Sequence, residues 1–419
     1  MLSNAWKYIP GDEFCLKVTD GTHDSPKQSE HGKPLITSKH IKGDEIDFST
    51  AYLISEQDFH EINKRSKVDQ WDVIISMIGA YCGFCFIECN EEIDYAVKNV
   101  GLFKAGSEVN AKWLYYYLNS SIGRAHLDAA KSGSTQPYIA LGALRNLPIL
   151  VPTNNDVKKN IVGILDAIDS KIRVNNRINA ELEAMAKTLY DYWFVQFDFP
   201  NANGKPYKTS GGKMVCNQTL KREIPEGWKA GNVLSVAKLL GGGTPKKTKP
   251  EYWNGAIPFF TPSDSDKNIF SVVTEDYITD EGLKDSSTRL FEPYTVFITA
   301  RGSVGRLALN AVPMAMNQSC YALRARDGIS YTFLFFLTKE LIHHLEVKAS
   351  GSVFNSIVSN DIEFTNLALP KDKTIIDKFA AIVEPAFEKI EIATKENKTL
   401  SSLRDWLLPM LMNGQVTVE

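Results

Sequence analysis

The sequence predicts a mixed α/β (α+β) protein built by internal duplication, in which two globular domains are each followed by a long helix. Three observations support this fold class. An amphipathic pattern runs through residues 155–196, the same pattern returns in residues 374–414, and short landmarks of the first globular part recur in the second. A repeat of this size determines the architecture of the whole chain.

The first long pattern predicts a helix. Its apolar residues recur at steps of three, four and sums of these, which gives a helix one apolar seam and does not suit a strand. The stretch contains no proline and a single glycine, Gly163, so we expect a helix of roughly 60 Å. Asn175 and Asn179 fall on the seam, where polar residues commonly fix helix register at a cost in stability.

The second long pattern repeats the first. When residues 374–414 are moved back by 218 positions (Pro370 onto Pro152), Ile390 falls on Ile172 and Asn397 on Asn179. Two unrelated helices could share a heptad, but these identities favour a duplication. If the copies pair, the two seams should bury against each other. The predicted seam consists of Ile161, Leu165, Ile168, Ile172, Asn179, Leu182, Leu189, Val383, Ile390, Asn397, Leu400 and Leu407.

The globular parts repeat at landmarks only. Gly243-Thr244 corresponds to Gly21-Thr22, and residues 257–261 correspond to 33–37. Residues 34–41, 73–78, 84–87 and 147–152 of the first part have strand character, and residues 109–120 have helical character. The predicted domains are residues 1–152 and 225–370, with a central helix at 153–197, a Gly- and Pro-rich connection at 198–224 and a C-terminal helix at 371–419.

Charge is segregated along a chain whose net charge is −3. That total argues mildly against a nucleic-acid-binding protein. Between Glu292 and Asp327, however, there are four arginines and no acidic residue, and residues 231–250 hold four lysines without a carboxylate. This distribution indicates a basic face on a nearly neutral body.

Several classes of protein and site are disfavoured. No apolar run reaches the ~20 residues of a membrane span, no signal-peptide pattern opens the chain, and six unevenly spread cysteines fit the reducing cytoplasm. Cys82, Cys85 and Cys89 lack a fourth ligand nearby and are interpreted as buried strand thiols, so no metal site is expected.

Catalytic motifs are missing too. The chain has no Pro-Pro, so the Asp/Asn-Pro-Pro-aromatic site of amino-methyltransferases is absent, and no phosphate-binding GxxxxGK[ST] occurs. His23 beside Asp20, and the pair His343-His344, are interpreted as structural or surface residues. The sequence therefore predicts a protein that is not an enzyme.

Two small polar loops suggest binding. Residues 131–138 (KSGSTQPY) and 348–356 (KASGSVFNS) occupy the same place in the two copies, each with a lysine at its head. Lysine, hydroxyl and backbone N–H groups suit phosphates, while carboxamides suit base edges. One such loop alone would be interpreted as a solvated turn. Their recurrence beside acid-free basic windows favours binding.

Particular segments resemble a known family. They are NRINAELEAMAKTLYDYWFVQFDFP at 176–200, TPKKTKPEYWNGAIPF at 244–259, SLRDWLLPMLMNG at 402–414, TDGTH at 19–23 and GSTQPYI at 133–139. With them the chain resembles, from end to end, the specificity (S) subunit of type I restriction–modification enzymes.

The resemblance implies two target-recognition domains separated by an antiparallel pair of long helices with a pseudo-twofold axis. It implies a non-catalytic, DNA-binding subunit that assembles with two methyltransferase subunits and two restriction (motor-nuclease) subunits. The DNA would be a split, asymmetric double-stranded site, and AdoMet, ATP and Mg²⁺ would serve the partners, with no cofactor in this chain. Base-reading residues cannot be transferred by position, because the family's recognition domains vary.

We expect DNA contacts in two clusters. Those of the first domain are Thr22, Lys39, Lys131, Ser134, Thr135 and Gln136. Those of the second are Thr244, Lys246, Lys247, Ser263, Arg301, Ser303, Ser352 and Asn355. Lys246 and Lys247 suit phosphates, whereas Gln136 and Arg301 suit base edges.

Two other functions remain open. An assembly scaffold that does not contact DNA is favoured by the net charge and opposed by the basic windows. An enzyme that modifies DNA itself is opposed by the missing methyltransferase motif. The recognition sequence and spacer length do not follow from the sequence.

Overall fold

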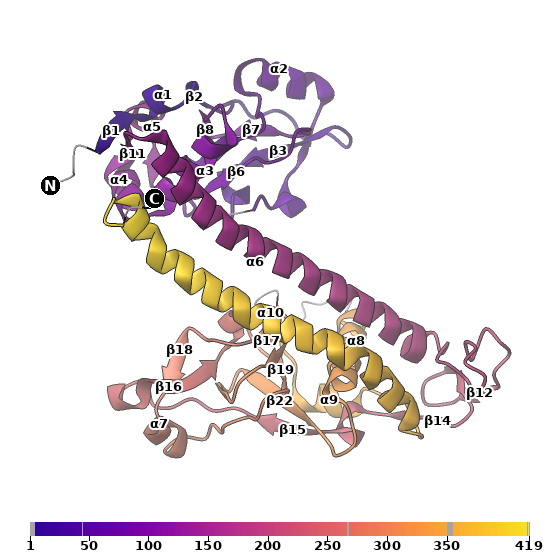
Figure 1. The fold of residues 1–419 in the computed structure, drawn as a ribbon. Coiled ribbons are helices and arrows are strands. Elements are labelled where there is room, and N and C mark those ends of the chain that lie inside the picture. Colours follow the sequence, from indigo (N-terminus) through magenta and orange to yellow (C-terminus); the bar gives the residue numbers. More distant parts are fainter. Residues whose placement is uncertain (1–4, 44, 266–267, 350–354, 417, 419) are drawn as a thin grey trace. The chain divides into compact units, whose positions relative to one another are not determined.

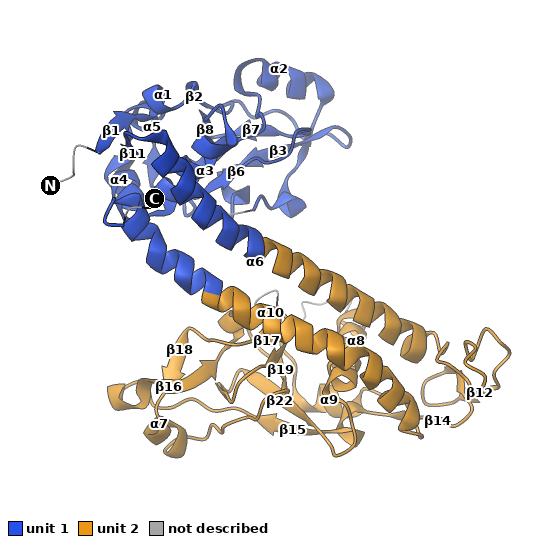
Figure 2. Ribbon diagram, in the orientation of Figure 1, with its two compact units in different colours: residues 1–171, 400–419 blue, residues 172–399 orange. Residues whose placement is uncertain are grey.

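The computed structural model describes residues 5–43, 45–265, 268–349, 355–416 and 418. The chain divides into two compact units (Figure 2). Unit 1 comprises residues 1–171 and 400–419, and unit 2 comprises residues 172–399. Both division points fall inside long helices, so each unit contains one globular part and a portion of both helices.

The globular part of unit 1 is built on two small sheets (Figure 1). A four-stranded antiparallel sheet has the order β2 (Lys17–Asp20), β8 (Val100–Lys104), β5 (Asp72–Ser76), β6 (Cys85–Ile87). A three-stranded sheet has the order β4 (Leu53–Ile54), β3 (Lys33–Thr37), β7 (Ala96–Lys98), with β3 and β7 parallel. β1 (Trp6–Pro10) pairs with β11 (Pro148–Pro152), and the short β9 (Lys131–Ser132) pairs with β10 (Tyr138–Ile139).

Helices cover these sheets. They are α1 (Gly11–Phe14), α2 (Glu56–Ser66), α3 (Glu108–Asn119), α4 (Ser121–Ala130) and α5 (Leu141–Arg145). All five residues of β5 are buried, as its unbroken apolar run predicts. Trp113 of α3 is fully buried, and its Nε1 donates to Leu150 O at 3.1 Å, so the helix is fixed against β11. The expected strands and helix of this part are therefore confirmed, except that residues 38–40 form a 3₁₀ turn.

The globular part of unit 2 repeats this topology. A five-stranded sheet has the order β15 (Ala237–Gly241), β22 (Cys320–Ala325), β19 (Val296–Thr299), β20 (Leu307–Asn310), β17 (Phe270–Ser271). A three-stranded sheet has the order β18 (Asp276–Ile278), β16 (Trp253–Phe260), β21 (Ala315–Met316), again with one parallel pair. β14 (Trp228–Gly231) pairs with β23 (Leu367–Pro370) as β1 pairs with β11. The helices are α7 (Asp280–Lys284), α8 (Tyr331–Lys348) and α9 (Ser359–Phe364).

Residues 198–224 are more ordered than their composition suggests. They contain β12 (Met214–Asn217) and the start of β13 (Arg222–Pro225), which form an antiparallel hairpin. Asn217 Oδ1 accepts from the backbone N–H groups of Thr219 and Leu220, so one side chain closes the turn.

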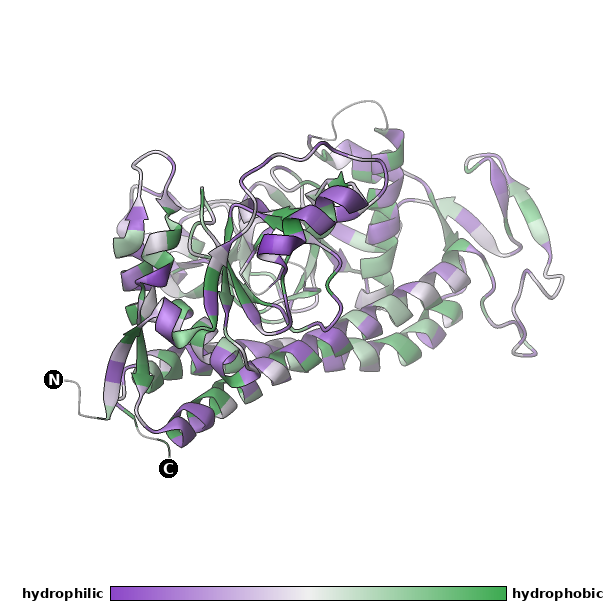
Figure 3. Cartoon of the chain, turned by 90° about the horizontal axis from the view of Figure 1, so that it is seen from above, coloured by the Kyte–Doolittle hydropathy of each residue, from purple (hydrophilic) through white to green (hydrophobic). Residues whose placement is uncertain are grey.

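The two long helices are α6 (Asn155–Tyr190), which continues into a π-helical turn at Asp191–Val195, and α10 (Thr374–Met412). In unit 1, Arg404 donates to Asp169 at 2.9 Å. In unit 2, Asn175 donates to Asn397 at 2.8 Å. Residue numbers rise along α6 as they fall along α10, so the helices pack antiparallel. Figure 3 shows hydrophobic and hydrophilic residues interspersed along both helices.

The seam residues do more than bury against one another. Ile161 and Leu165 are fully buried and join the core of unit 1 together with Leu408 and Leu411. In unit 2, Val383 and Ile390 are buried in a core that also contains aromatic residues of α6, α8 and α10. Ile168 and Asn179 are also buried, whereas Ile172, Leu182, Leu189, Asn397, Leu400 and Leu407 are partly exposed.

Candidate nucleic-acid interface

Loop 131–139 in unit 1 docks on the segment that follows β5. Ile139 N donates to Met77 O and Gly79 N donates to Pro137 O, both at 2.9 Å. Ser134, Thr135 and Gln136 project from this loop and are exposed. Gly133 has φ +85°, and a Cβ there would lie 2.7 Å from Gln136 O, so the tight turn requires glycine.

Lys131 is only partly available to DNA. Its Nζ lies 2.7 Å from Asp128 Oδ1, and its side chain is half-buried. The lysine therefore has a carboxylate partner before any phosphate arrives.

The 3₁₀ turn at residues 38–40 touches the same segment. Ser38 Oγ donates to Asn99 O at 2.7 Å and accepts from the N–H groups of Met77 and Ile78 at 3.2 and 3.3 Å. His40 Nδ1 accepts from Thr37 N at 2.9 Å. Burial lowers the pKa of His40 and so favours this neutral, accepting ring. Lys39, between these two anchors, is exposed.

The turn at Thr22 completes this surface. Thr22 is half-buried, and its N–H donates to Val97 O at 3.0 Å. The next residue, His23, places Nε2 2.8 Å from the buried Asp20 carboxylate and Nδ1 3.1 Å from Asn99 Oδ1. Arg65 also donates to Asp20. The turn thus contacts the Asn99 side chain through His23, and the Asn99 carbonyl accepts a hydrogen bond from Ser38.

Unit 2 brings together the corresponding segments. Ile357 N donates to Ala300 O at 3.0 Å, as Ile139 N does to Met77 O in unit 1. Arg301 N donates to Ser319 O at 3.2 Å. Thr244 Oγ1 donates to Gln318 Oε1. A Cβ added to Gly302 would lie 3.4 Å from the ring of Pro262, the residue before Ser263.

These contacts gather most of the second cluster. Thr244, Ser263, Arg301 and Ser303 lie on segments that touch, and Asn355 precedes Ile357 by two residues. Ser303 is half-buried, and its carbonyl accepts from Thr299 Oγ1. Ser352 lies outside the described residues.

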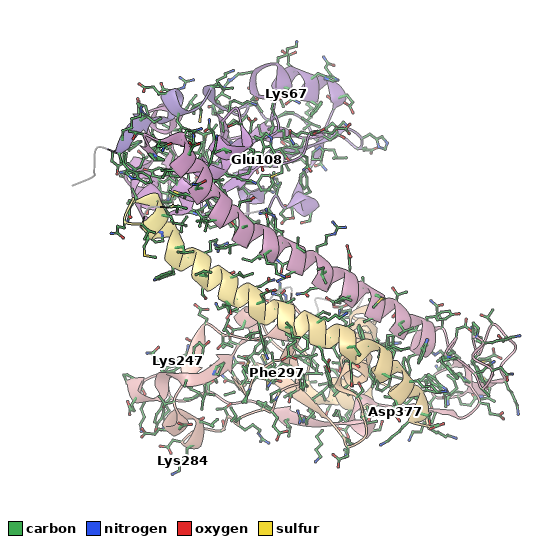
Figure 4. The ribbon with its side chains drawn as sticks, viewed as in Figure 1. Lys67, Glu108, Lys247, Lys284, Phe297 and Asp377 are labelled. Carbon is green, nitrogen blue, oxygen red and sulfur yellow. The ribbon has the colours of Figure 1, made fainter. Side chains whose placement is uncertain are left out.

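The lysines of residues 244–250 differ in their surroundings. Lys246 and Lys247 are exposed, and Figure 4 shows Lys247 at the periphery of unit 2 and Phe297 in its interior. Lys249 instead donates to the Tyr252 hydroxyl at 2.7 Å.

The four arginines of the acid-free window differ in their partners among the described residues. Arg306 Nη1 donates to Ser265 O at 3.0 Å, Arg324 pairs with Glu292, and Arg326 donates to Leu234 O at 3.2–3.3 Å. Arg301 is exposed, and within the described part of the chain its side chain has no ion pair. The structure thus distinguishes one candidate reader from three structural arginines.

The described residues hold no group of three or more His, Cys, Asp or Glu side chains that could bind a metal ion. Cys82 and Cys85 are buried, and burial raises the pKa of Cys85 to about 11, so these thiols stay protonated. Cys89 was expected to be buried and is exposed, because it follows the end of β6. Across the parts of the chain that the structure describes, no helix is both long and apolar enough to cross a membrane.

The sequence of the chain matches the model of a known protein family. The model of the type I restriction modification DNA specificity domain matches residues 12–184 and again residues 225–402. The chain belongs to this family. Two matches in one chain also agree with the repeated topology. Proteins of this family are non-catalytic specificity subunits, which confer DNA target specificity on a type I restriction–modification complex.

Individual relatives agree. The type I restriction enzyme MjaIX specificity subunit of Methanocaldococcus jannaschii is 27% identical over 319 residues, which cover 74% of this chain and 70% of that protein. The HindI specificity subunit of Haemophilus influenzae is 24% identical over 337 residues, 69% of this chain and 73% of the relative. The fold resembles the crystal structure of the S subunit from M. genitalium, with a TM-score of 0.56, 15% identity and coverage of 98% and 96%.

Residues with no signal in the sequence also line these surfaces of the specificity subunit. Asn99 and Gln318 lie beside the Thr22 and Thr244 turns. Lys42 places its Nζ 3.9 Å from the centre of the Tyr81 ring, in the segment that follows β5. Each depends on a partner far away in sequence, so no local motif could have revealed it.

Proposed function

We propose that this specificity subunit reads a bipartite, asymmetric site in double-stranded DNA, with one half-site bound by each recognition domain. One observation carries the proposal. Each unit has a turn (at Thr22 or Thr244), a 3₁₀ segment (Ser38–His40 or Pro262–Asp264) and a backbone contact to the segment after its central strand (from Ile139 or Ile357), but the two frames present different side chains. The shared backbone arrangement would let both domains dock on DNA in the same way. The different side chains would let each domain recognise a different half-site sequence.

The exposed side chains fit the chemistry of DNA. Lys246 and Lys247 would meet phosphates, which fix position without reading sequence. Arg301 suits the O6 and N7 acceptors of guanine, and Gln136 suits a base edge in the first half-site. Residues 1–152 and 225–370 would be the recognition domains, with the helices at 153–197 and 371–419 as the spacer.

The helix pair would be the scaffold for two methyltransferase subunits, to which two restriction subunits add for cleavage. In unit 2, Met185, Tyr192 and Ile382 are exposed large apolar residues beside a groove of about 430 Å³ between α6 and α10. In unit 1, Trp406 of α10 is 64% exposed. Apolar surface of this kind commonly marks a protein interface. AdoMet, ATP and Mg²⁺ would be bound by these partners.

A DNA-binding test with the methyltransferase partner decides between this function and a scaffold that does not touch DNA. Selection from randomised duplexes should return two short, different half-sites separated by a spacer of fixed length. A complex that assembles but shows no sequence preference would favour the scaffold, which the net charge of −3 otherwise supports.

The scaffold function needs its own measurement. Ile382→Glu in the helix groove should weaken binding of the methyltransferase subunit, whereas Glu388→Gln, on the exposed surface of the same helix, should not. Equal binding by both variants would exclude this face as the docking surface.

A further inference from the structure

A carboxamide side chain occupies the same position in both recognition units. Val97 of β7 pairs with Ile36, and Met316 of β21 pairs with Phe260, the residue that corresponds to Ile36 in the repeat. Asn99 and Gln318 each lie two residues after these paired positions. β7 and β21 are the strands that pair in parallel with β3 and β16. The Thr22 turn meets the end of β7 through Thr22 N and Val97 O at 3.0 Å, and the Thr244 turn meets β21 through Gly243 N and Met316 O at 3.0 Å.

Each carboxamide is held by a side chain of the facing turn. In unit 1, His23 Nδ1 lies 3.1 Å from Asn99 Oδ1, and the buried Asp20 holds the opposite edge of the ring at 2.8 Å. In unit 2, Thr244 Oγ1 donates to Gln318 Oε1. Both carboxamides are therefore oriented before any ligand binds, although Asn99 is only half-buried and Gln318 is exposed.

We propose that Asn99 and Gln318 read base edges, one in each half-site, and that His23 and Thr244 are positioning residues for them. This inference rests on the proposed DNA-reading function. A carboxamide presents a donor and an acceptor in one plane, which matches N7 and the N6 amino group of adenine. In unit 2 the Gln318 oxygen has two lone pairs, so it accepts from Thr244 Oγ1 and from one base amino group together.

The neighbourhood agrees with base reading. Ser319, next to Gln318, accepts at its carbonyl from Arg301 N, so Gln318 lies one residue from the backbone contact of Arg301, which has no ion pair among the described residues. Ser38, which fixes the 3₁₀ turn beside Lys39, donates to the carbonyl of Asn99. Each carboxamide thus lies within the predicted DNA-contact cluster of its unit.

A structural role explains Gln318 less well than Asn99. Asn99 has φ +55°, a conformation that asparagine tolerates, so its backbone alone could account for it. Gln318 is not among the non-glycine residues with positive φ. Its neighbour Asn317 instead has a structural role, because its Oδ1 accepts from Ser319 N at 3.0 Å.

The test uses the full-length subunit assembled with its methyltransferase partner, and selection from randomised duplex DNA. Gln318→Glu should exchange a preference for adenine for one for cytosine at one position of one half-site, because a carboxylate accepts from the cytosine amino group. Gln318→Met, of similar size, should reduce that preference about 10- to 100-fold. Asn99→Asp should do the same at one position of the other half-site. Gln218→Glu and Asn203→Asp, at exposed sites in residues 198–224, are the matched controls.

The positioning role has a separate readout. Thr244→Val should reduce the same adenine preference that Gln318→Met reduces and leave the base preference at all other positions of the site unchanged. Thr244→Ser, which keeps the hydroxyl, should retain the adenine preference. Failure of the serine variant to rescue would overturn the positioning role.

The outcomes separate the two proposals. A wild-type complex that selects no bipartite site would overturn the proposed function itself. A bipartite site left unchanged by the Gln318 and Asn99 variants would overturn the readers alone. Loss of preference at every position, together with a lower unfolding temperature, would mean that the carboxamides are structural and would also overturn them.

Discussion

At the scale of single residues, similar side chains in one basic window have different roles. Arg301 is exposed and unpaired among the described residues, whereas Arg326 donates to Leu234 O. Arg301→Ala should therefore relax one position of the second half-site at a cost of about 1–3 kcal/mol. Arg326→Ala should instead lower the free energy of unfolding by about 1 kcal/mol and leave specificity intact. Competition binding and urea unfolding of both variants measure this; the reverse pattern would show that the DNA face is misplaced.

Lys246 and Lys247 should contribute affinity rather than specificity. Changing both to Ala should weaken binding to all sequences alike and reduce the slope of log K against log salt by about one for each lost contact. Lys208→Ala, which removes an exposed lysine from residues 198–224, is the control for net charge. An unchanged slope in the double variant would place these lysines away from phosphates.

The buried carboxyl of Asp72 should make the stability of unit 1 depend on pH. Burial, the largest cause, raises its pKa to about 6, although Lys104 lies beside it. The folded state then binds the Asp72 proton more tightly than the unfolded state does. Protonation of Asp72 therefore adds to the free energy of unfolding fully below about pH 4, and this contribution is lost as the pH rises through about 6. Asp72→Asn should remove that dependence, so wild type should lose roughly 1–3 kcal/mol relative to the variant over this range. Urea unfolding at pH 4 and 7 measures it; a constant difference would contradict it.

At the scale of elements, the helix pair carries a polar cluster within unit 2. Asn175, buried, donates to Asn397 and to Glu396 at 2.8 and 2.7 Å. Asn179 is also buried, but its Oδ1 has no hydrogen-bond partner among the described atoms. The asparagine expected to set register with Asn397 is therefore the less satisfied of the two.

The two asparagines should respond differently to the same substitution. Asn175→Leu leaves Asn397 and Glu396 without this donor and should destabilise the helix pair by about 1–3 kcal/mol. Asn179→Leu removes an unsatisfied buried oxygen and should be neutral or stabilising. The urea midpoints of the two variants, which are matched controls for each other, measure this. Equal losses would indicate that Asn179 carries the register as well.

At the scale of the whole molecule, we expect the helices to set the spacer and the globular domains to set the half-sites. Four residues inserted near Asn175–Asn179 should change spacer length and keep both half-site sequences. Replacing residues 225–370 with the matching domain of a relative should change one half-site and keep the spacer. Methylome sequencing of cells carrying each variant measures both, and a changed half-site with an intact spacer after the helix insertion would rule out a ruler.

The sequence by itself determined the elements and their duplication. These features can be recognised from the sequence because they are local or repeated patterns. They are the helical periodicity, the apolar strands and the repeat that places Asn397 on Asn179. The polar loop at residues 131–138 in unit 1 and the basic windows in unit 2 also pointed to segments that the structure brings into contact within each unit.

Only the tertiary structure decided what each side chain does. His23 and Asn99 are 76 positions apart, and Thr244 and Gln318 are 74 apart, yet each pair meets. Whether Arg301 or Arg326 is free, and which seam asparagine finds a partner, likewise depends on backbone carbonyls and side chains supplied by distant segments. Such contacts form only when strands and helices pack, because hydrogen bonding depends on distance and angle rather than on position along the chain.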